Sequence, residues 1–132
     1  KADQYKEEAI TLSSEEQTKI LAVVEKDRVL SEKEDFDGLM AIYDSSYPDL
    51  TQKTVQWKQL AAVFDFKSTY SSVKLIKASE KEAYVRVQSK NEKVSGPEFR
   101  NFNADGITVL KKQADGAWKV ADSIPLAMEF TQ

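Results

Sequence analysis

The spacing of the hydrophobic residues changes once along this chain of 132 residues, and that change constrains the fold more than any other feature. In the first half, apolar side chains recur every three to four residues, as on one face of an α-helix. From Ser68 onward they alternate with a period of two, as in β-strands. Helices therefore precede strands instead of alternating with them. This order predicts an α+β fold, with three helices packed on one face of a curved antiparallel sheet.

Three helices are expected before the sheet. The first begins at the capping signal SSEEQ, where Ser13 or Ser14 can cap, and runs to about Glu32. The second lies in EDFDGLMAIYDSSY and ends before Pro48, because proline restricts the residue before it to extended geometry. Thr51 is the expected cap of the third.

Four strands are expected in the second half, in the segments TYSSVKLIKAS, EAYVRVQSKN, FRNFNADGITVLKKQ and GAWKVADSIPLAMEF. The pair Asp115-Gly116 predicts a tight hairpin between the last two. The segment NADG at 103–106 is either a further hairpin turn or a bulge inside one long bent strand. We favour the bulge, because such bends let a sheet curl.

The length fits one domain, expected over residues 14–132, after a polar spacer over residues 1–13. No apolar run approaches the roughly 20 residues that a membrane-spanning helix needs. Because the chain begins at Lys1 and not at Met, we expect that an upstream segment was removed: a secretory signal, a membrane anchor, a tag or the rest of a longer chain. We expect a secreted or anchored, extracytoplasmic protein, with a cytoplasmic one as the alternative.

The chain contains no cysteine and no histidine. This excludes disulfides, thiolate metal sites, cysteine nucleophiles and a Ser-His-Asp triad, so any chemistry must use carboxylates, Tyr, Lys or Arg. No glycine-rich phosphate loop, EF-hand or HExxH pattern occurs, and we expect no metal and no cofactor. Residues 51–132 carry 13 basic and 9 acidic side chains, but the bases are scattered, which disfavours nucleic-acid binding.

Asp27 does not fit the helical pattern of the first helix. It lies in VVEKDRVL, two turns after Ile20, where the apolar stripe asks for a hydrophobic residue. In one interpretation it is a carboxylate in an apolar pocket, with a raised pKa, that serves as an acid, a base or a ligand anchor. In the other it pairs with a basic residue such as Arg28, Arg86 or Arg100 and closes the core.

Other residues are candidates for a site. Tyr43, Tyr47 and Trp57 form a possible aromatic rim that could stack on a ligand, although the helical spacing of Tyr43 and Trp57 also suits a core. Tyr47 precedes proline in a loop and is expected to be exposed. Asp122, near a sheet edge, is a second candidate for a buried acid.

The strand YVRVQ places its two valines on one face and Tyr84, Arg86 and Gln88 on the other. We favour the arrangement in which the valines face the helices. The opposite register would bring Arg86 into the interior, opposite Asp27. The orientation of Arg100 is open in the same way.

The order of elements, together with EDFDGLMAIYDSSYPDL and DGAWKVADS, resembles the nuclear transport factor 2-like superfamily over about residues 14–130. Proteins of this superfamily, including SnoaL-like and ketosteroid-isomerase-like members, share a cone-shaped fold. An acidic and apolar pattern in the second helix and an Asp-Gly-x-Trp-Lys-Val turn are common in it. The matching residues are Asp35, Asp37, Leu39, Ile42, Tyr43, Asp115, Gly116, Trp118, Lys119 and Val120.

The resemblance implies a cavity between the concave face of the sheet and the helices. It also implies a homodimer through the outer face of the sheet, which would make Tyr84, Arg86 and Gln88 interface residues. Members that isomerise steroids use a Tyr on the first helix, which this chain lacks within that helix, and dehydratase-type members rely on His. The residues expected at the cavity are Asp27, Ser31, Tyr43, Tyr47, Trp57 and Asp122.

We therefore expect a non-catalytic domain that binds a small ligand or another protein. The alternative is a cyclase- or isomerase-type enzyme that uses Asp27 with Tyr43, and Asp122, as acid and base. An inhibitor of the cystatin type has a related helix-on-sheet shape, but three helices precede the sheet here instead of one.

Overall fold

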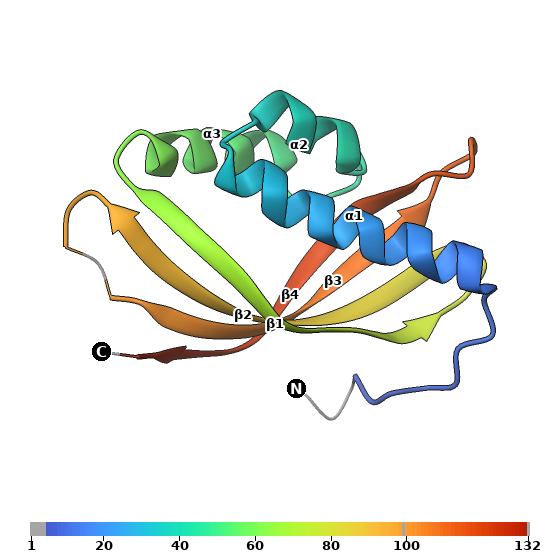
Figure 1. The fold of residues 1–132 in the computed structure, drawn as a ribbon. Helices are drawn as coiled ribbons and strands as arrows, with labels where there is room; N and C mark the ends of the chain where they lie inside the picture. Colours follow the sequence, from blue (N-terminus) through green and yellow to red (C-terminus); the bar gives the residue numbers. More distant parts are fainter. Residues whose placement is uncertain (1–4, 99, 132) are drawn as a thin grey trace.

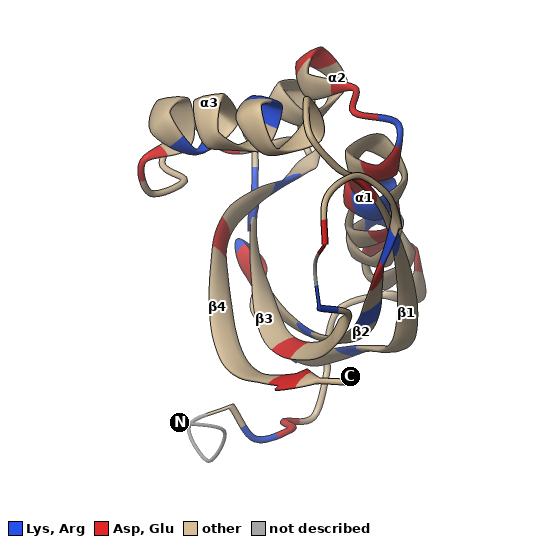
Figure 2. Ribbon diagram, turned by 90° about the vertical axis from the view of Figure 1, so that its left-hand side faces the viewer, with Lys and Arg blue, Asp and Glu red and all other residues tan. Residues whose placement is uncertain are grey.

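The structure, a computed structural model, describes residues 5–98 and 100–131. Three helices, α1 (Ser14–Glu32), α2 (Phe36–Ile42) and α3 (Leu50–Ala61), precede four strands, β1 (Asp65–Ala78), β2 (Glu82–Ser95), β3 (Phe102–Lys112) and β4 (Trp118–Phe130). The strands form one antiparallel sheet in the order β1-β2-β3-β4. Figure 1 shows the helices on one side of this sheet, and Figure 2 shows the sheet curving beneath them. The predicted α+β fold is confirmed.

The helix boundaries follow the capping signals at α1 but not at α3. Ser13 is the N-cap of α1, and its side chain accepts a hydrogen bond from the Glu16 N–H at 3.2 Å. Helix α3 begins at Leu50 after Asp49, which has a φ of 54° and makes no capping hydrogen bond with its side chain. Thr51 lies inside the first turn, so its prediction as the cap was wrong.

The helices and the inner face of the sheet share the core. Ile20 and Val24 of α1 pack against Val85 of β2, Leu110 of β3 and Trp118 of β4, all nearly inaccessible to solvent. Val85 faces the helices, so Arg86 next to it points to the outer face, as favoured from the sequence. There its Nη2 atom lies 2.6 Å from Oδ2 of Asp105.

Strand β3 continues through residues 103–106, so NADG lies within one strand and is not a hairpin turn, but the bulge expected in NADG itself lies on the partner strand instead. Its pairing with β4 shifts between Asp105 and Gly106, which are opposite Ala127 and Pro125. The additional residue, Leu126, is therefore on β4. Such a bulge bends the sheet locally and increases its twist.

A second cluster of apolar residues lies on the outer face of the sheet. Ile76, Ile107 and Val109 are buried there, and the N-terminal segment contacts the same region. The ring of Tyr5 stacks on that of Tyr84 at 6.3 Å, and the N–H of Glu8 donates to the carbonyl of Ile76 at 2.7 Å. Residues 5–12 of the expected spacer thus run along the sheet (Figure 1); residues 1–4 lie outside the described residues.

Among the residues that the structure describes, no helix combines the length and the apolar character needed to cross a membrane.

The turn between α1 and α2 requires a residue in the left-handed conformation. The N–H of Asp35 donates to the carbonyl of Leu30 at 3.0 Å, and the N–H of Glu34 donates to the carbonyl of Ser31 at 3.1 Å. These two bonds define a Schellman motif, whose left-handed position is usually glycine. Here it is Glu34, with a φ of 57°.

Replacing Glu34 by glycine is expected to stabilise the domain. The substitution removes the steric cost of a side chain at positive φ, which exceeds the added entropy of glycine in the unfolded chain, for a net gain of about 0.5–1 kcal/mol. Urea titration of Glu34→Gly and the parent measures this difference. Lys33→Gly, one residue earlier at a right-handed position, is the control and is expected to lose stability. A loss in Glu34→Gly would contradict the assignment.

Candidate functional site

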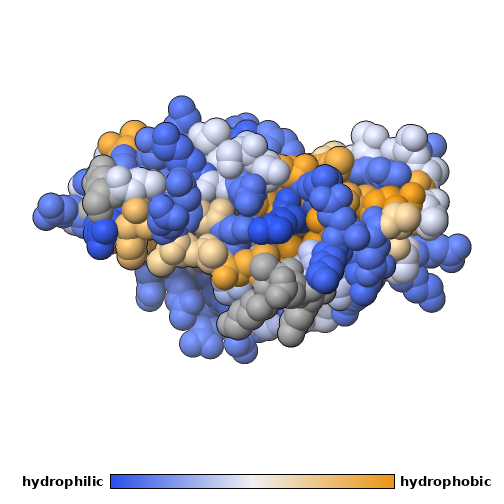
Figure 3. Space-filling view, turned by 90° about the horizontal axis from the view of Figure 1, so that it is seen from below, coloured by the Kyte–Doolittle hydropathy of each residue, from blue (hydrophilic) through white to orange (hydrophobic). Residues whose placement is uncertain are grey.

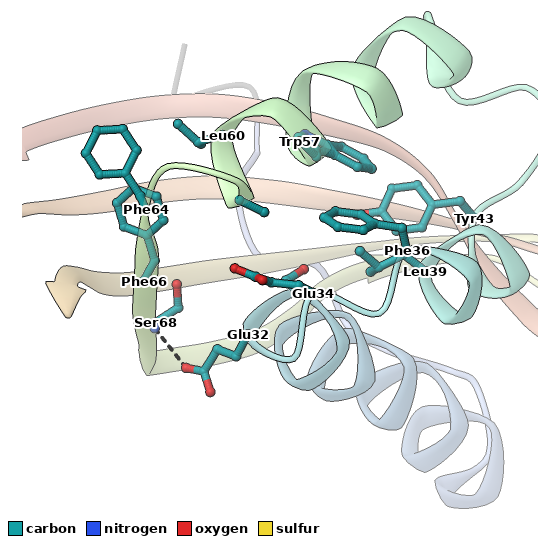
Figure 4. Close-up of a pocket in the computed structure, with 12 residues that line it drawn as sticks. Glu32, Glu34, Phe36, Leu39, Tyr43, Trp57, Leu60, Phe64, Phe66 and Ser68 are labelled. Carbon is teal, nitrogen blue, oxygen red and sulfur yellow. Dashed lines mark hydrogen bonds between the residues drawn. The ribbon is translucent and has the colours of Figure 1, made fainter. Parts of the chain in front are cut away.

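A pocket opens between α2, α3 and the beginning of β1, with a cavity volume of about 230 Å³. Five aromatic side chains form most of its wall, together with Leu39, Leu60 and Ala61. Ser31, Glu32 and Glu34, from the end of α1 and the turn after it, and Ser68 of β1 supply the polar groups (Figure 4). We call this the aromatic pocket; its aromatic residues are Phe36, Tyr43, Trp57, Phe64 and Phe66.

A second tyrosine, Tyr47, continues the aromatic wall behind Tyr43. Tyr43 and Trp57 meet edge to face with centroids 5.6 Å apart, and Tyr47 lies 4.9 Å from Tyr43. Tyr47 is only 6% exposed, so the prediction that it is exposed was wrong. The loop is held against the sheet because the N–H of Asp44 donates to the carbonyl of Val120 at 2.7 Å, and it turns Tyr47 inward.

Tyr47 does not line the aromatic pocket. Its hydroxyl donates to Oγ of Ser123 on β4 at 3.0 Å, which leaves its ring as support for Tyr43 and Trp57. The ammonium of Lys53 lies 4.8 Å from the centroid of the Tyr47 ring. The residue therefore stabilises the site from behind.

Asp27 is half-buried and accepts a hydrogen bond from the hydroxyl of Tyr43, with 2.8 Å between the two oxygens. None of the ion pairs between described residues includes Asp27, and the three arginines proposed as its partners contact other groups. Arg28 pairs with Glu25 and Glu32, Arg86 pairs with Asp105, and the guanidinium of Arg100 lies 4.1 Å from the centroid of the Phe130 ring. The interpretation of Asp27 as a paired core residue was therefore wrong.

Burial raises the pKa of Asp27 to about 6, and the hydrogen bond from Tyr43 opposes this change in part. The pKa of Tyr43 is held far above its ordinary value by burial and by the adjacent carboxylate. Burial raises the pKa of Tyr70, on the facing strand β1, and the charge of Asp27 adds to this shift. Asp27 could thus exchange a proton near neutral pH, with Tyr43 as its hydrogen-bonding partner.

The carboxylates at the rim of the aromatic pocket differ in their partners. Glu32 lies 3.3 Å from the guanidinium of Arg28 and accepts the backbone N–H of Ser68 at 2.9 Å (Figure 4). Glu34 is exposed, and its side chain makes no hydrogen bond or ion pair with the described residues. The ammonium of Lys58 lies outside the pocket lining, 5.9 Å from the centroid of the Phe36 ring.

Asp122 is not part of the cavity. The pairing of β3 with β4 shifts between Val109 and Leu110, which are opposite Asp122 and Val120, so that Ala121 is an additional residue. This bulge turns Asp122 to the outer face, where its charge contributes to the raised pKa of Tyr84. The sequence-based placement of Asp122 in the cavity was wrong because strict alternation along β4 does not hold there.

Three of the six expected cavity residues line the aromatic pocket: Ser31, Tyr43 and Trp57. Asp27 and Tyr47 contact Tyr43 from outside the lining. Phe64 and Phe66 are not among the six expected cavity residues. Phe64 fits the helical spacing of the third helix, and the first strand was expected to begin after Phe66. Their spacing of two, directly after the third helix, is the signal that could have placed them on one side of the extended segment that leads into β1.

A wider trough of about 380 Å³ occupies the rest of the concave face, between α1 and the far ends of the strands. Small and apolar residues line it together with polar ones, among them Arg28, Tyr70, Asn91 and Asp105. Ser31 and Ser68 border both cavities. Within residues 5–98 and 100–131, no three acidic side chains are grouped so that they could hold a metal ion.

The fold is that of the nuclear transport factor 2-like proteins, as the sequence resemblance indicated. A ketosteroid isomerase-like protein from Erwinia carotovora atroseptica SCRI1043 superposes with a TM-score of 0.67 at 16% identity, covering 91% of this chain and 99% of that one. A conserved protein from Planctomyces limnophilus DSM 3776 gives a TM-score of 0.68 at 15% identity, covering 86% of this chain and 100% of that one. At these identities the similarity establishes the fold alone.

Other similar structures are parts of larger proteins. Bd1075 of Bdellovibrio bacteriovorus superposes with a TM-score of 0.71 at 15% identity, covering 88% of this chain but 44% of that protein. In Bd1075 the same fold therefore occurs as one unit within a longer chain.

The sequence defines the family more narrowly than the fold does. Residues 22–131 match the family described as the C-terminal domain of anti-sigma-I factor RsgI9, and the chain belongs to that family. Anti-sigma-I factor RsgI9 of Acetivibrio thermocellus is 32% identical to this chain over 80 residues, which are 61% of this chain. The match spans 11% of the length of that curated relative.

The raised pKa of Asp27 predicts a specific dependence of stability on pH. The folded state binds this proton more tightly than the unfolded chain, where the pKa is 3.8. Stability is therefore lost as the pH rises through the interval from about 4 to 6. Asp27→Asn can still accept the bond from Tyr43, and we expect it to exceed the parent in free energy of unfolding by about 2–3 kcal/mol at pH 7.5.

Urea titrations of both proteins at pH 4 and pH 7.5 measure this effect, and the difference is expected to vanish near pH 4. Glu80→Gln, in the turn between β1 and β2, controls for the loss of one negative charge at an exposed site. A destabilised Asp27→Asn at pH 7.5 would show that the carboxylate is held by a favourable interaction instead.

Proposed function

We propose that this domain binds a small ligand in the aromatic pocket and performs no catalysis. The observation that carries the proposal is the pocket itself: a concave apolar site with a small number of polar groups at its rim, which is the usual form of a ligand site. Its volume of about 230 Å³ is below the roughly 300–1,000 Å³ of sites for drug-sized molecules. The ligand therefore has one ring or a short branched body.

The pocket is held open by contacts that do not involve a ligand. The hydroxyl of Tyr43 is fixed by Asp27, the ring of Tyr47 supports Tyr43 and Trp57, and Glu32 is bonded to β1 through Ser68. A preformed site spends less of its binding energy on ordering side chains, which favours affinity for a small molecule.

The family suggests a consequence of ligand binding for the rest of the protein. We propose that the domain is the ligand-responsive part of an anti-sigma factor, in which occupancy of the pocket controls the remainder of the protein. We also propose that the domain is extracytoplasmic, where it would meet ligands outside the cell; a cytoplasmic sensor is the alternative. Digestion of intact cells with an added protease, followed by immunodetection of the domain, distinguishes the two locations.

The enzymatic alternative rests on Asp27 and Tyr43. A carboxylate with a pKa of about 6 next to a tyrosine hydroxyl is suited to proton transfer. Asp122, the third residue of the expected set, lies on the outer face of the sheet, and Asp27 lies behind Tyr43 instead of lining the aromatic pocket. We therefore place binding before catalysis.

Binding in the aromatic pocket should depend on Trp57. We expect a ligand-observed NMR screen of single-ring and short branched compounds to give binders whose affinity falls at least about tenfold in Trp57→Leu, because the substitution removes an aromatic wall. Trp118→Phe changes the other tryptophan, which lies beside Ile20 and Val24 in the core, and is expected to retain binding. A screen without binders, or binders unaffected by Trp57→Leu, would contradict the proposal.

We further propose that the domain forms a homodimer through the outer face of the sheet. Tyr84 and Arg86 share this face with Gln88 and the buried residues Ile107 and Val109. The view of this face in Figure 3 shows hydrophobic surface between hydrophilic residues. Because Arg86 is already paired with Asp105, this surface can be covered without burying an unpaired charge.

Sedimentation equilibrium tests the dimer. We expect the parent to sediment as a dimer and Arg86→Glu to sediment as a monomer, because the substitution places two negative groups side by side on the contact face. Lys81→Glu, in the turn between β1 and β2, makes the same charge change away from this face and should leave the dimer intact. A monomeric parent at high concentration would exclude the proposed interface.

A further inference from the structure

The groups around the aromatic pocket are unequally charged. Its lining contains two carboxylates, Glu32 and Glu34, and no basic side chain. Its walls are mainly rings, whose faces carry partial negative charge and attract cations. The pocket thus combines an apolar surface with a negative potential, which is an arrangement that anions avoid and that cations with an apolar body prefer.

Glu34 is placed at the rim despite an unfavourable backbone conformation. Its position in the Schellman motif favours glycine, yet the chain has a glutamate there at a φ of 57°. Figure 4 shows the Glu34 side chain between the wall formed by Phe36 and the strand that carries Phe66 and Ser68. A residue retained against local stability at the mouth of a pocket indicates a role for its side chain in that pocket.

A third carboxylate acts from behind the wall. Asp27 accepts the hydrogen bond of the Tyr43 hydroxyl at 2.8 Å, which fixes the orientation of the Tyr43 ring in the aromatic pocket. Donation to a carboxylate also draws the hydroxyl proton away from the ring and makes the ring a better acceptor for a cation. The charge of Asp27 and the ring of Tyr43 therefore act in the same direction.

Two basic residues near the pocket oppose this potential. Arg28 is neutralised by Glu25 at 2.7 Å and by Glu32 at 3.3 Å. Lys58 is not paired with an acid among the described residues and lies over the Phe36 ring, 5.9 Å from its centroid. Glu34 and Asp27 are thus the carboxylates near the pocket that form no ion pair with a basic side chain among the described residues.

We propose that the aromatic pocket selects a small organic cation, an alkylated ammonium with a compact apolar body, over neutral and anionic molecules of the same shape. This inference rests on the proposed function and adds the class of ligand. The aromatic walls receive the alkyl groups, and Glu34 faces the positive charge from the rim.

Three probes of nearly the same shape test the proposal: choline, neutral 3,3-dimethylbutan-1-ol and anionic 3,3-dimethylbutanoate. Each is titrated into the protein while the indole N–H signal of Trp57 is followed by NMR. We expect choline to bind about tenfold more tightly than the alcohol, since a cation at an aromatic site gains roughly 1–2 kcal/mol, and the carboxylate to bind more weakly than both.

Substitutions at the rim distinguish an effect of charge on binding from an effect of a damaged fold. We expect Glu34→Gln to weaken choline binding several-fold and to leave the binding of the alcohol unchanged, while Lys58→Gln strengthens choline binding. Glu34→Gly should weaken choline binding and raise the midpoint of thermal unfolding, so that its loss of affinity cannot result from a damaged fold. Glu80→Gln is the matched control for charge and should bind like the parent.

The outcomes distinguish this inference from the proposed function. Equal affinity for choline and the alcohol, both lost in Trp57→Leu, would leave the pocket as a ligand site and overturn its preference for cations. Tighter binding of the carboxylate would also overturn it. If none of the three probes shifts the Trp57 signal and the compound screen gives no binder either, both the inference and the proposed function fail.

Discussion

Tyr43, at the end of α2, links this helix to α1, to α3 and to strand β4. Its hydroxyl is bonded to Asp27 of α1, its backbone forms a parallel bridge with Val120 of β4, and its ring contacts Trp57 of α3. Helix α2 has only seven residues and would not be stable alone, because isolated helices of that length are marginal in water. The position of α2, and with it one wall of the aromatic pocket, therefore depends on this residue and on the carboxylate that holds it.

The contact between Tyr43 and Asp27 has one stabilising and one destabilising component. The hydrogen bond fixes two helices relative to each other, while the burial of the carboxylate makes its ionised form unfavourable and raises its pKa to about 6. Glu34 also lowers the stability of the fold, through its backbone, because it has a positive φ that glycine adopts at a lower energetic cost. Both features lie around one pocket, which is where a protein retains groups that lower its stability.

The sequence predicted the fold because its signals there are local and repeated. The change of period at residue 68, the capping serine at α1 and the turn at Asp115-Gly116 each depend on a few neighbouring residues. The positions of the side chains at the site depend on single local irregularities, which cannot be predicted from the periodicity of the sequence. The additional residue Ala121 moves Asp122 to the other face of β4, and one backbone bond from Asp44 turns Tyr47 inward. Asp27 was recognised as unusual from its place in the stripe, but its partner is a tyrosine from the next helix, which no spacing rule identifies.

The most direct test of this account is the ionisation of Asp27, followed by the carbon-13 NMR signal of its carboxyl group as a function of pH, with and without saturating choline. The account predicts a pKa of about 6 in the free domain and a lower value when a cation occupies the pocket in front of Tyr43. Tyr43 donates the hydrogen bond to this carboxyl group, and its own hydroxyl does not change charge in this range. An ordinary pKa near 4 that choline does not alter would contradict both the buried carboxylate and its connection to the pocket.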